Sequence, residues 1–165
     1  MDRSVTAERT SAGLVATLFA TMVLLVGCGA SAPSGVGSTS VTDTLWSDRT
    51  AYVGDNSRVI ALVRQIFPAS DFGYTIGLHT ATRPYSLTIT IARSSKPYES
   101  VDFTREATAL LGLIANLDTV TIASTASPRT TSLTTEVASR SLGYDVKELG
   151  RDQAKLAAFT ADAPD

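Results

Sequence analysis

Two side chains with distinctive reactivity occur once each in this sequence: the thiol of Cys28 and the imidazole of His79. A single cysteine excludes an internal disulfide and a cysteine-rich metal site. His79 could act as a base only if the fold brought a nucleophile and an acid to it. We therefore expect no catalytic residue, no metal ligand and no cofactor site, and we expect that the protein is not an enzyme.

Known catalytic motifs are missing from the sequence. There is no Gly-x-Ser-x-Gly elbow and no phosphate-binding glycine loop. The position three residues before each lysine holds no serine, which excludes a Ser-x-x-Lys pair; these positions are Arg93, Tyr144 and Asp152. An envelope hydrolase with an unrecognised site around His79 or Asp55 stays open as an alternative.

The N-terminal residues resemble a targeting sequence in composition. Residues 1–11 are polar and include Arg3 and Arg9, and residues 12–26 are apolar without interruption by charge. This apolar segment has the length of a signal-peptide core and is short for a membrane span of about 20 residues. Small residues follow at once, so we predict a signal peptide over residues 1–27.

The residues Leu25, Val26, Gly27 and Cys28 resemble the lipobox of bacterial lipoproteins. In that family the cysteine thiol receives diacylglycerol, and cleavage makes the cysteine the first mature residue. The resemblance implies a palmitate-type lipid anchor on Cys28 at the extracytoplasmic face of the cell membrane. Each buried methylene contributes about 0.8 kcal/mol, so an anchor of several acyl chains can hold a soluble domain at the membrane.

A segment rich in Gly, Ser, Thr and Ala follows the cysteine. Residues 28–44 show no hydrophobic periodicity and cannot bury enough surface to offset their ordering entropy. We interpret them as the lipidated cysteine and a flexible linker. The folded domain is expected over residues 45–160, followed by a short tail at 161–165.

One short motif near the start of this domain has two interpretations. Tyr52, Gly54, Asp55 and Asn56 precede a predicted helix. They can form a binding lip, because a helix N-terminus favours anionic groups. They can equally form a structural corner, in which Asp55 or Asn56 caps the helix and Tyr52 packs over it. We favour the structural interpretation.

A second motif, Arg83-Pro84-Tyr85, has the composition of a turn and, as a weaker alternative, of a recognition loop. Tyr85 could form an aromatic surface for a peptide or glycan together with Tyr74 and Tyr98. Tyrosine is also a common residue on half-buried sheet faces, so this alternative stays open.

The periodicity of apolar residues predicts an α+β domain. We expect about three strands in a mostly antiparallel sheet, with helices on one face. The predicted helices are 57–67, 103–116, 133–142 and 146–160, and the predicted strands are 74–79, 87–91 and 119–124. Residues 125–130 are predicted to be a loop, and Gly143 to end a helix.

Several of these segments together resemble the DUF4825 family of bacterial extracellular domains. The resemblance rests on Tyr-Val-Gly-Asp-Asn-Ser at 52–57, the apolar helix after it, the Pro84-Tyr85 pair and the strand that follows. Members stand alone as lipoproteins or lie beside a membrane-bound metallopeptidase domain. The resemblance implies a fold and an extracytoplasmic location, and it leaves the activity open.

Charge and composition limit the classes of partner that this protein is expected to bind. The net charge is −2 and the basic residues are scattered, so nothing indicates binding to nucleic acid. Apolar residues make up 44% of the chain, which is enough for a core. The leading hypothesis is a membrane-anchored, non-catalytic binding or accessory module with an envelope protein or peptide as its partner.

Overall fold

The computed structural model describes residues 40–162 of this 165-residue chain. The predicted signal peptide, the lipobox with Cys28, and all of the linker before Ser40 lie outside the described residues. No helix within residues 40–162 has the length and apolar character needed to cross a membrane.

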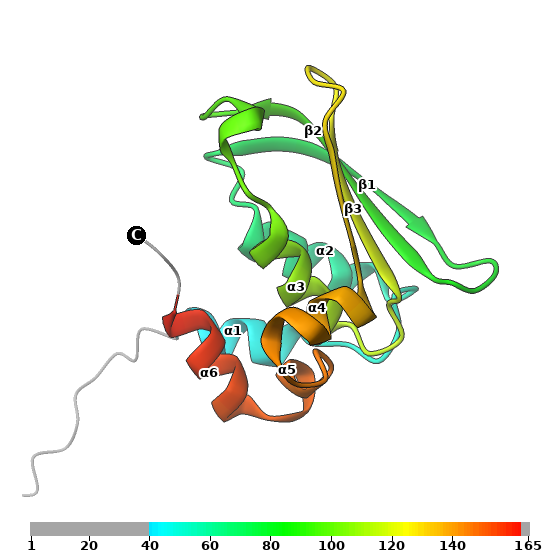
Figure 1. Cartoon of the computed structure of the whole chain (residues 1–165), viewed down its shortest axis with the longest axis vertical. Helices are drawn as coiled ribbons and strands as arrows, with labels where there is room; N and C mark the ends of the chain where they lie inside the picture. Colours follow the sequence, from blue (N-terminus) through cyan, green and yellow to red (C-terminus); the bar gives the residue numbers. More distant parts are fainter. Residues whose placement is uncertain (1–39, 163–165) are drawn as a thin grey trace, which may run out of the picture. The chain divides into compact units, whose positions relative to one another are not determined.

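The described chain forms an α+β domain, as predicted (Figure 1). The strands belong to one sheet in the order β1-β2-β3-β4. The elements are α1 (Val41–Asp48), α2 (Asn56–Ile66), β1 (Phe72–His79), β2 (Ser86–Ser94), the 3₁₀ turn η1 (Tyr98–Ser100), α3 (Thr104–Leu113), β3 (Thr119–Ser124), β4 (Thr130–Thr134), α4 (Thr135–Leu142), α5 (Glu148–Arg151) and α6 (Gln153–Ala161).

The sheet differs from the prediction in the number of its strands. It has four strands rather than about three, because Thr130–Thr134 pairs with β3 where a loop and a helix start were expected. Four of the five residues in this segment are β-branched or aliphatic, which suits a pleated surface. The sheet is mostly antiparallel, as predicted, because β1 with β2 and β3 with β4 are antiparallel pairs, while β2 and β3 run parallel. The long connection through α3 returns the chain to the same end of the sheet, as a parallel pair requires.

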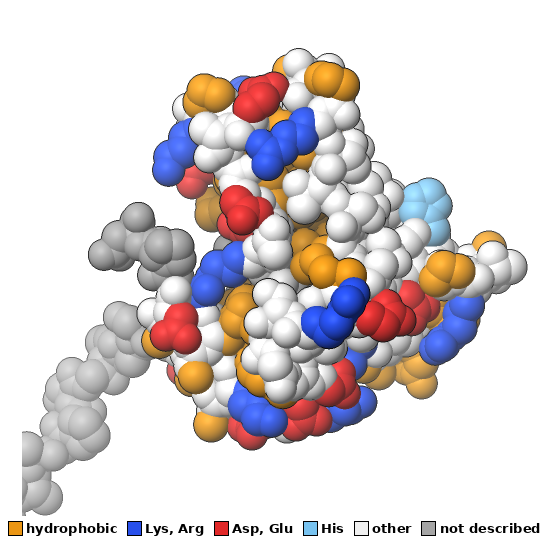
Figure 2. Space-filling view, viewed as in Figure 1, with side chains coloured by type: hydrophobic (Ala, Val, Ile, Leu, Met, Phe, Trp, Pro, Cys, Tyr) orange, Lys and Arg blue, Asp and Glu red, His pale blue; other side chains and the backbone are white. Residues whose placement is uncertain are grey.

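The two faces of the sheet have different environments. One face is buried under the helices and presents alternate apolar residues: Leu87, Ile89, Ile91, Val120, Ile122 and Leu133. The other face presents mainly threonine, with Thr75 opposite Thr90 on β2 and Thr88 opposite Thr121 on β3. Figure 2 shows the strands as largely uncharged surface, while charged side chains gather over the helices and loops. His79 is exposed, in agreement with the sequence interpretation.

Helix α3 is the central buried element, as its wide apolar arc predicted. Every residue from Ala107 to Leu113 is buried. An aromatic cluster closes the core at one end, where Phe103 packs against Phe67 (6.0 Å between ring centroids) and Tyr98 (5.2 Å). Aromatic pairs at these separations stabilise the fold beyond the contribution of the apolar area that they bury.

Helix boundaries follow the caps. Asp55 caps α2 through a bond from the Arg58 N–H, and Gly143 ends α4 with φ of 77°, both as predicted. The single last helix predicted for 146–160 is instead two helices. The Asp152 carboxylate accepts the N–H groups of Ala154 and Lys155 and so begins α6. Helix α1 begins at Val41, before the predicted domain start at residue 45.

Candidate functional site

The motif at Tyr52–Ser57 forms a corner tied to the rest of the domain by its backbone. The Asp55 N–H donates to the Tyr52 carbonyl (3.0 Å), which closes a turn, and the Val53 N–H donates to Asn116 Oδ1 (2.7 Å). Asp55 caps α2 and lies 3.7 Å from Arg58 Nε. Tyr52 does not pack over the helix as expected, because 68% of its surface is exposed. The bonds of this corner support the structural interpretation.

The Arg83-Pro84-Tyr85 segment is a turn in the hairpin between β1 and β2. The peptide bond before Pro84 is cis. The Tyr85 N–H donates to Asp118 Oδ2 (2.8 Å), and its carbonyl accepts the N–H groups of Asp118 and Thr119. These bonds fix the turn on the start of β3. The predicted aromatic surface does not form as a unit, because Tyr98 is buried and donates its hydroxyl to the Ile122 carbonyl.

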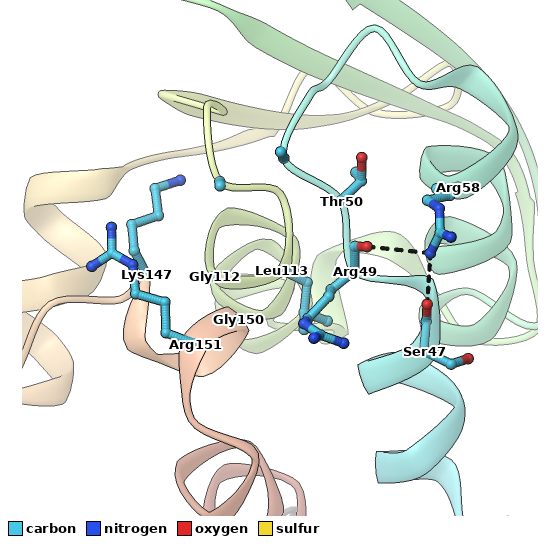
Figure 3. Close-up of a pocket in the computed structure, with 11 residues that line it drawn as sticks. Ser47, Arg49, Thr50, Arg58, Gly112, Leu113, Lys147, Gly150 and Arg151 are labelled. Carbon is cyan, nitrogen blue, oxygen red and sulfur yellow. Dashed lines mark hydrogen bonds between the residues drawn. The ribbon is translucent and has the colours of Figure 1, made fainter.

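A cationic hollow of about 500 Å³ lies where several helices end, and we call it the helix junction (Figure 3). Its basic lining residues are Arg49, Arg58, Lys147 and Arg151. Lys147 Nζ donates to the carbonyls of Leu111 (2.6 Å), Ile114 (3.0 Å) and Leu117 (2.6 Å). Helix α3 has no basic residue in its own last turn, so Lys147 supplies the cation that its C-terminus favours. Burial lowers the pKa of Lys147 to about 8, against the opposite influence of Asp118 and Asp145.

The other cations of the helix junction also have partners within the domain. Helix α1 also lacks a basic residue in its last turn, and Arg58 Nη1 donates to the Ser47 carbonyl at 2.7 Å. Arg49 stacks over the Trp46 ring at 3.8 Å and donates to the Trp46 carbonyl. Arg151 pairs with Asp145 and Glu148. The charge of this hollow is therefore matched by carbonyls and carboxylates of the domain itself.

A second hollow, of about 630 Å³, lies between α2 and β1, and we call it the α2–β1 groove. One wall is a helix stripe at four-residue spacing, and the other is a strand stripe at two-residue spacing. The lining residues are Asn56, Ile60 and Arg64 from α2, with Tyr74, Ile76, Leu78 and Thr80 from β1 and the residue after it. The strand residues are only half-buried, unlike the fully buried Leu87, Ile89 and Ile91 on the neighbouring strand. An apolar floor therefore stays open to solvent along this groove.

Strand β1 is also an edge of the sheet, paired only with β2 in the sheet order. An edge strand leaves alternate N–H and C=O groups without a sheet partner, and proteins usually protect such edges with proline, charge or short length. Strand β1 spans eight residues and contains no proline, lysine, arginine or acid. The opposite edge, β4, spans only five residues.

Arg64 is the one charged residue that lines the α2–β1 groove. It is exposed and makes no ion pair with any residue between 40 and 162. Arg64 lies near the end of α2 and Tyr74 near the start of β1, so both line the end of the groove that is next to the short connection between these elements. Burial raises the pKa of Tyr74, while the positive charge of Arg64 acts in the opposite direction.

The residues considered for catalysis are not brought together. His79 lies on the strand beside Thr88, with 3.4 Å between Nε2 and the Thr88 hydroxyl. Asp55 is engaged in capping α2. No group of three or more His, Cys, Asp or Glu suited to a metal ion occurs among residues 40–162.

Of the residues in the α2–β1 groove, the sequence singled out Asn56, and it indicated Tyr74 only as part of an aromatic surface with Tyr85 and Tyr98. Ile76 and Leu78 were predicted only as members of the strand 74–79. The one available signal was Ile60, which lies beside the Val59–Val63 stripe rather than on it. An apolar residue at the border of a helix stripe is common, so this signal alone could not identify a groove.

These features define a small α+β domain with a mixed four-stranded sheet, one polar sheet face and an open groove at one edge. A family model described as "Domain of unknown function (DUF4825)" matches residues 45–135, more than half of the chain. The chain belongs to this family. The match includes both walls of the α2–β1 groove and ends at the junction of β4 and α4. Neither the curated proteins nor the solved structures contain a match to this chain.

Proposed function

We propose that this protein is a lipid-anchored, extracytoplasmic binding or accessory module that holds an envelope protein or peptide in the α2–β1 groove. The observation that carries the proposal is the open apolar floor of this groove beside an edge strand without proline, lysine, arginine or acid. Apolar surface that a small domain leaves open in a concave site is typical of ligand and protein binding.

The proposed location rests on the N-terminal sequence. The apolar segment 12–26, the lipobox-like residues Leu25–Cys28 and the polar linker after them support export, lipidation and tethering. The alternative of an envelope hydrolase gains no support from geometry, because Asp55 caps a helix and His79 lies next to Thr88 on the exposed sheet face.

Lipidation can be tested by metabolic labelling with a palmitate analogue in a bacterial host. The native chain should be labelled and recovered with the membrane fraction, whereas Cys28→Ser should lose the label. Label that persists in Cys28→Ser would refute anchoring at this residue, independently of any result on binding.

Binding can be tested by site-specific photo-crosslinking of the full chain in cells. A photoreactive amino acid at Ile60, inside the groove, should give adducts with a partner. The same amino acid at Thr90, on the exposed face of the sheet, is the matched control and should give none. Adducts at both positions alike, or at neither, would contradict a binding role for the groove.

A further inference from the structure

We propose that the α2–β1 groove binds an extended peptide segment that adds to β1 as a further strand, with apolar side chains at alternate positions and an acidic side chain opposite Arg64. This inference rests on the proposed binding function and specifies the chemistry of the partner. Addition of a strand to an exposed sheet edge is a general mode of peptide recognition.

The backbone of β1 provides the first argument. Strand β1 pairs with β2 from Phe72 to His79, with a register shift between Gly73 and Tyr74, so one flank is largely satisfied and the other faces out. The Phe72 N–H is bonded to the Pro68 carbonyl instead of a strand partner. The outer flank carries the alternate N–H and C=O groups of an eight-residue strand with no charged residue or proline to repel a partner. Those groups match the alternating donors and acceptors of an extended chain.

The spacing of the two walls provides the second argument. Successive lining residues on α2 are four apart, which is about 6 Å along a helix axis. Successive lining residues on β1 are two apart, which is about 7 Å along a strand. The steps nearly coincide, so Ile60 and Ile76 can flank a subsite between two end subsites. A peptide with side chains at positions i, i+2 and i+4 would place one in each.

The direction of the walls and their charge provide the third argument. A connection of only five residues joins α2 to β1, so the two run in opposite directions, and Arg64 lies at the Tyr74 end. The other end is formed by the neutral Asn56 and Thr80. A partner that places an acid at the Tyr74 end would gain an ion pair with a cation that lacks one among the described residues.

A second copy of this chain fits the groove less well. In a two-fold pairing of β1 with itself, Arg64 of each copy would meet the Asn56 end of the other. Asp55 is the nearest acid in sequence there, and it is already engaged with the Arg58 N–H and guanidinium. The charge pattern therefore favours a different partner with its own acidic residue.

The probe is a displayed library of random ten-residue peptides, selected on the full chain and resynthesised for affinity measurement. Selected peptides should show apolar residues at alternate positions with Asp or Glu at one end. Ile76→Glu, on the groove floor, should weaken binding at least tenfold. Thr75→Glu, the adjacent residue on the opposite face of the same strand, should change it less than twofold.

Charge reversal separates recognition from a loss of folding. Arg64→Glu should weaken the acidic peptide about tenfold, and should bind a peptide with Lys in place of the acid more tightly than the unchanged protein does. A merely structural role of Arg64 would not produce this exchange of preference.

Several results would overturn this proposal. One is a set of selected peptides that lack alternation or bind independently of Ile76, and a selection that yields no binders would contradict the proposal as well. Another is a dimer in sedimentation equilibrium that Ile76→Glu dissociates, which would identify a second copy as the occupant. The last is an unchanged acidic preference in Arg64→Glu. If photo-crosslinks at Ile60 persist despite these results, the binding function stands and only the strand mode is wrong.

Discussion

The helix junction and the α2–β1 groove are hollows of similar size, about 500 and 630 Å³. They differ in whether their charged and apolar side chains have partners within the domain. In the helix junction, Lys147 and Arg58 donate to helix-end carbonyls, and Arg151 pairs with acids. In the groove, Ile76 is half open and Arg64 has no ion pair among residues 40–162. The comparison indicates that the first hollow stabilises the fold and that the second is available for recognition.

Close packing sharpens the contrast. A Cβ atom on Gly150 would lie 2.6 Å from the Gly112 carbonyl oxygen, so α3 and α5 contact through their backbones beside the helix junction. No such contact closes the groove, where half-buried side chains form the floor. Substitutions should therefore affect stability at the junction and binding at the groove.

The largest effect is expected for Lys147→Met. It keeps most of the side-chain length but leaves the carbonyls of Leu111, Ile114 and Leu117 without their donor. The free energy of unfolding should fall by about 3 kcal/mol in chemical denaturation. Lys155→Met is the matched control and should cost about 0.5 kcal/mol, because its pair with Glu148 is partly exposed. Equal losses would contradict the role of Lys147 as the cap of α3.

A smaller loss is expected for Gly150→Ala. The added methyl group would overlap the Gly112 carbonyl, and overpacking of this kind should lower the free energy of unfolding by about 2 kcal/mol. Gly54→Ala is the control, since a Cβ there has no neighbour within 4 Å, and its thermal midpoint should stay near that of the native protein. A midpoint for Gly150→Ala close to that of Gly54→Ala would show that α3 and α5 can separate without cost.

The smallest effect concerns pH and two glutamates in the first turns of α3 and α4. Burial raises the pKa of Glu106, so ionisation destabilises the folded state as the pH rises above the usual value near 4.5. Glu106→Gln should therefore raise the thermal midpoint at pH 7 and not at pH 4. The hydrogen bond from Thr134 lowers the pKa of Glu136, so Glu136→Gln should lower the midpoint at pH 7. The same sign for both variants at pH 7 would contradict this assignment.

Much of the local structure follows from short-range physics in the sequence. The Asp55 cap, the apolar stripe of α2, the alternation in β1 and β2 and the left-handed Gly143 all depend on residues within a few positions. One error arose where a distant segment decides, since Thr130–Thr134 is a strand because β3 lies beside it. The other was local, since the Asp152 cap that separates α5 from α6 acts on Ala154 and Lys155, within three residues.

The candidate site divides in the same way. The chemistry of Asn56, Arg64 and the Tyr74–Leu78 alternation can be read from the chain, but not their openness. Alternating apolar residues look alike in a central strand and in an edge strand, and only the sheet order placed β1 at the edge.

By itself, the sequence determined which residues could be apolar, capping or charged, and it predicted an anchor at Cys28 and the DUF4825 fold. The tertiary structure decided which of these residues remain available. Lys147 donates its hydrogen bonds to the carbonyls at the end of α3, while β1 lies at an open edge of the sheet beside α2. The physical reason is that satisfaction of a polar group or an apolar surface depends on neighbours brought from far along the chain.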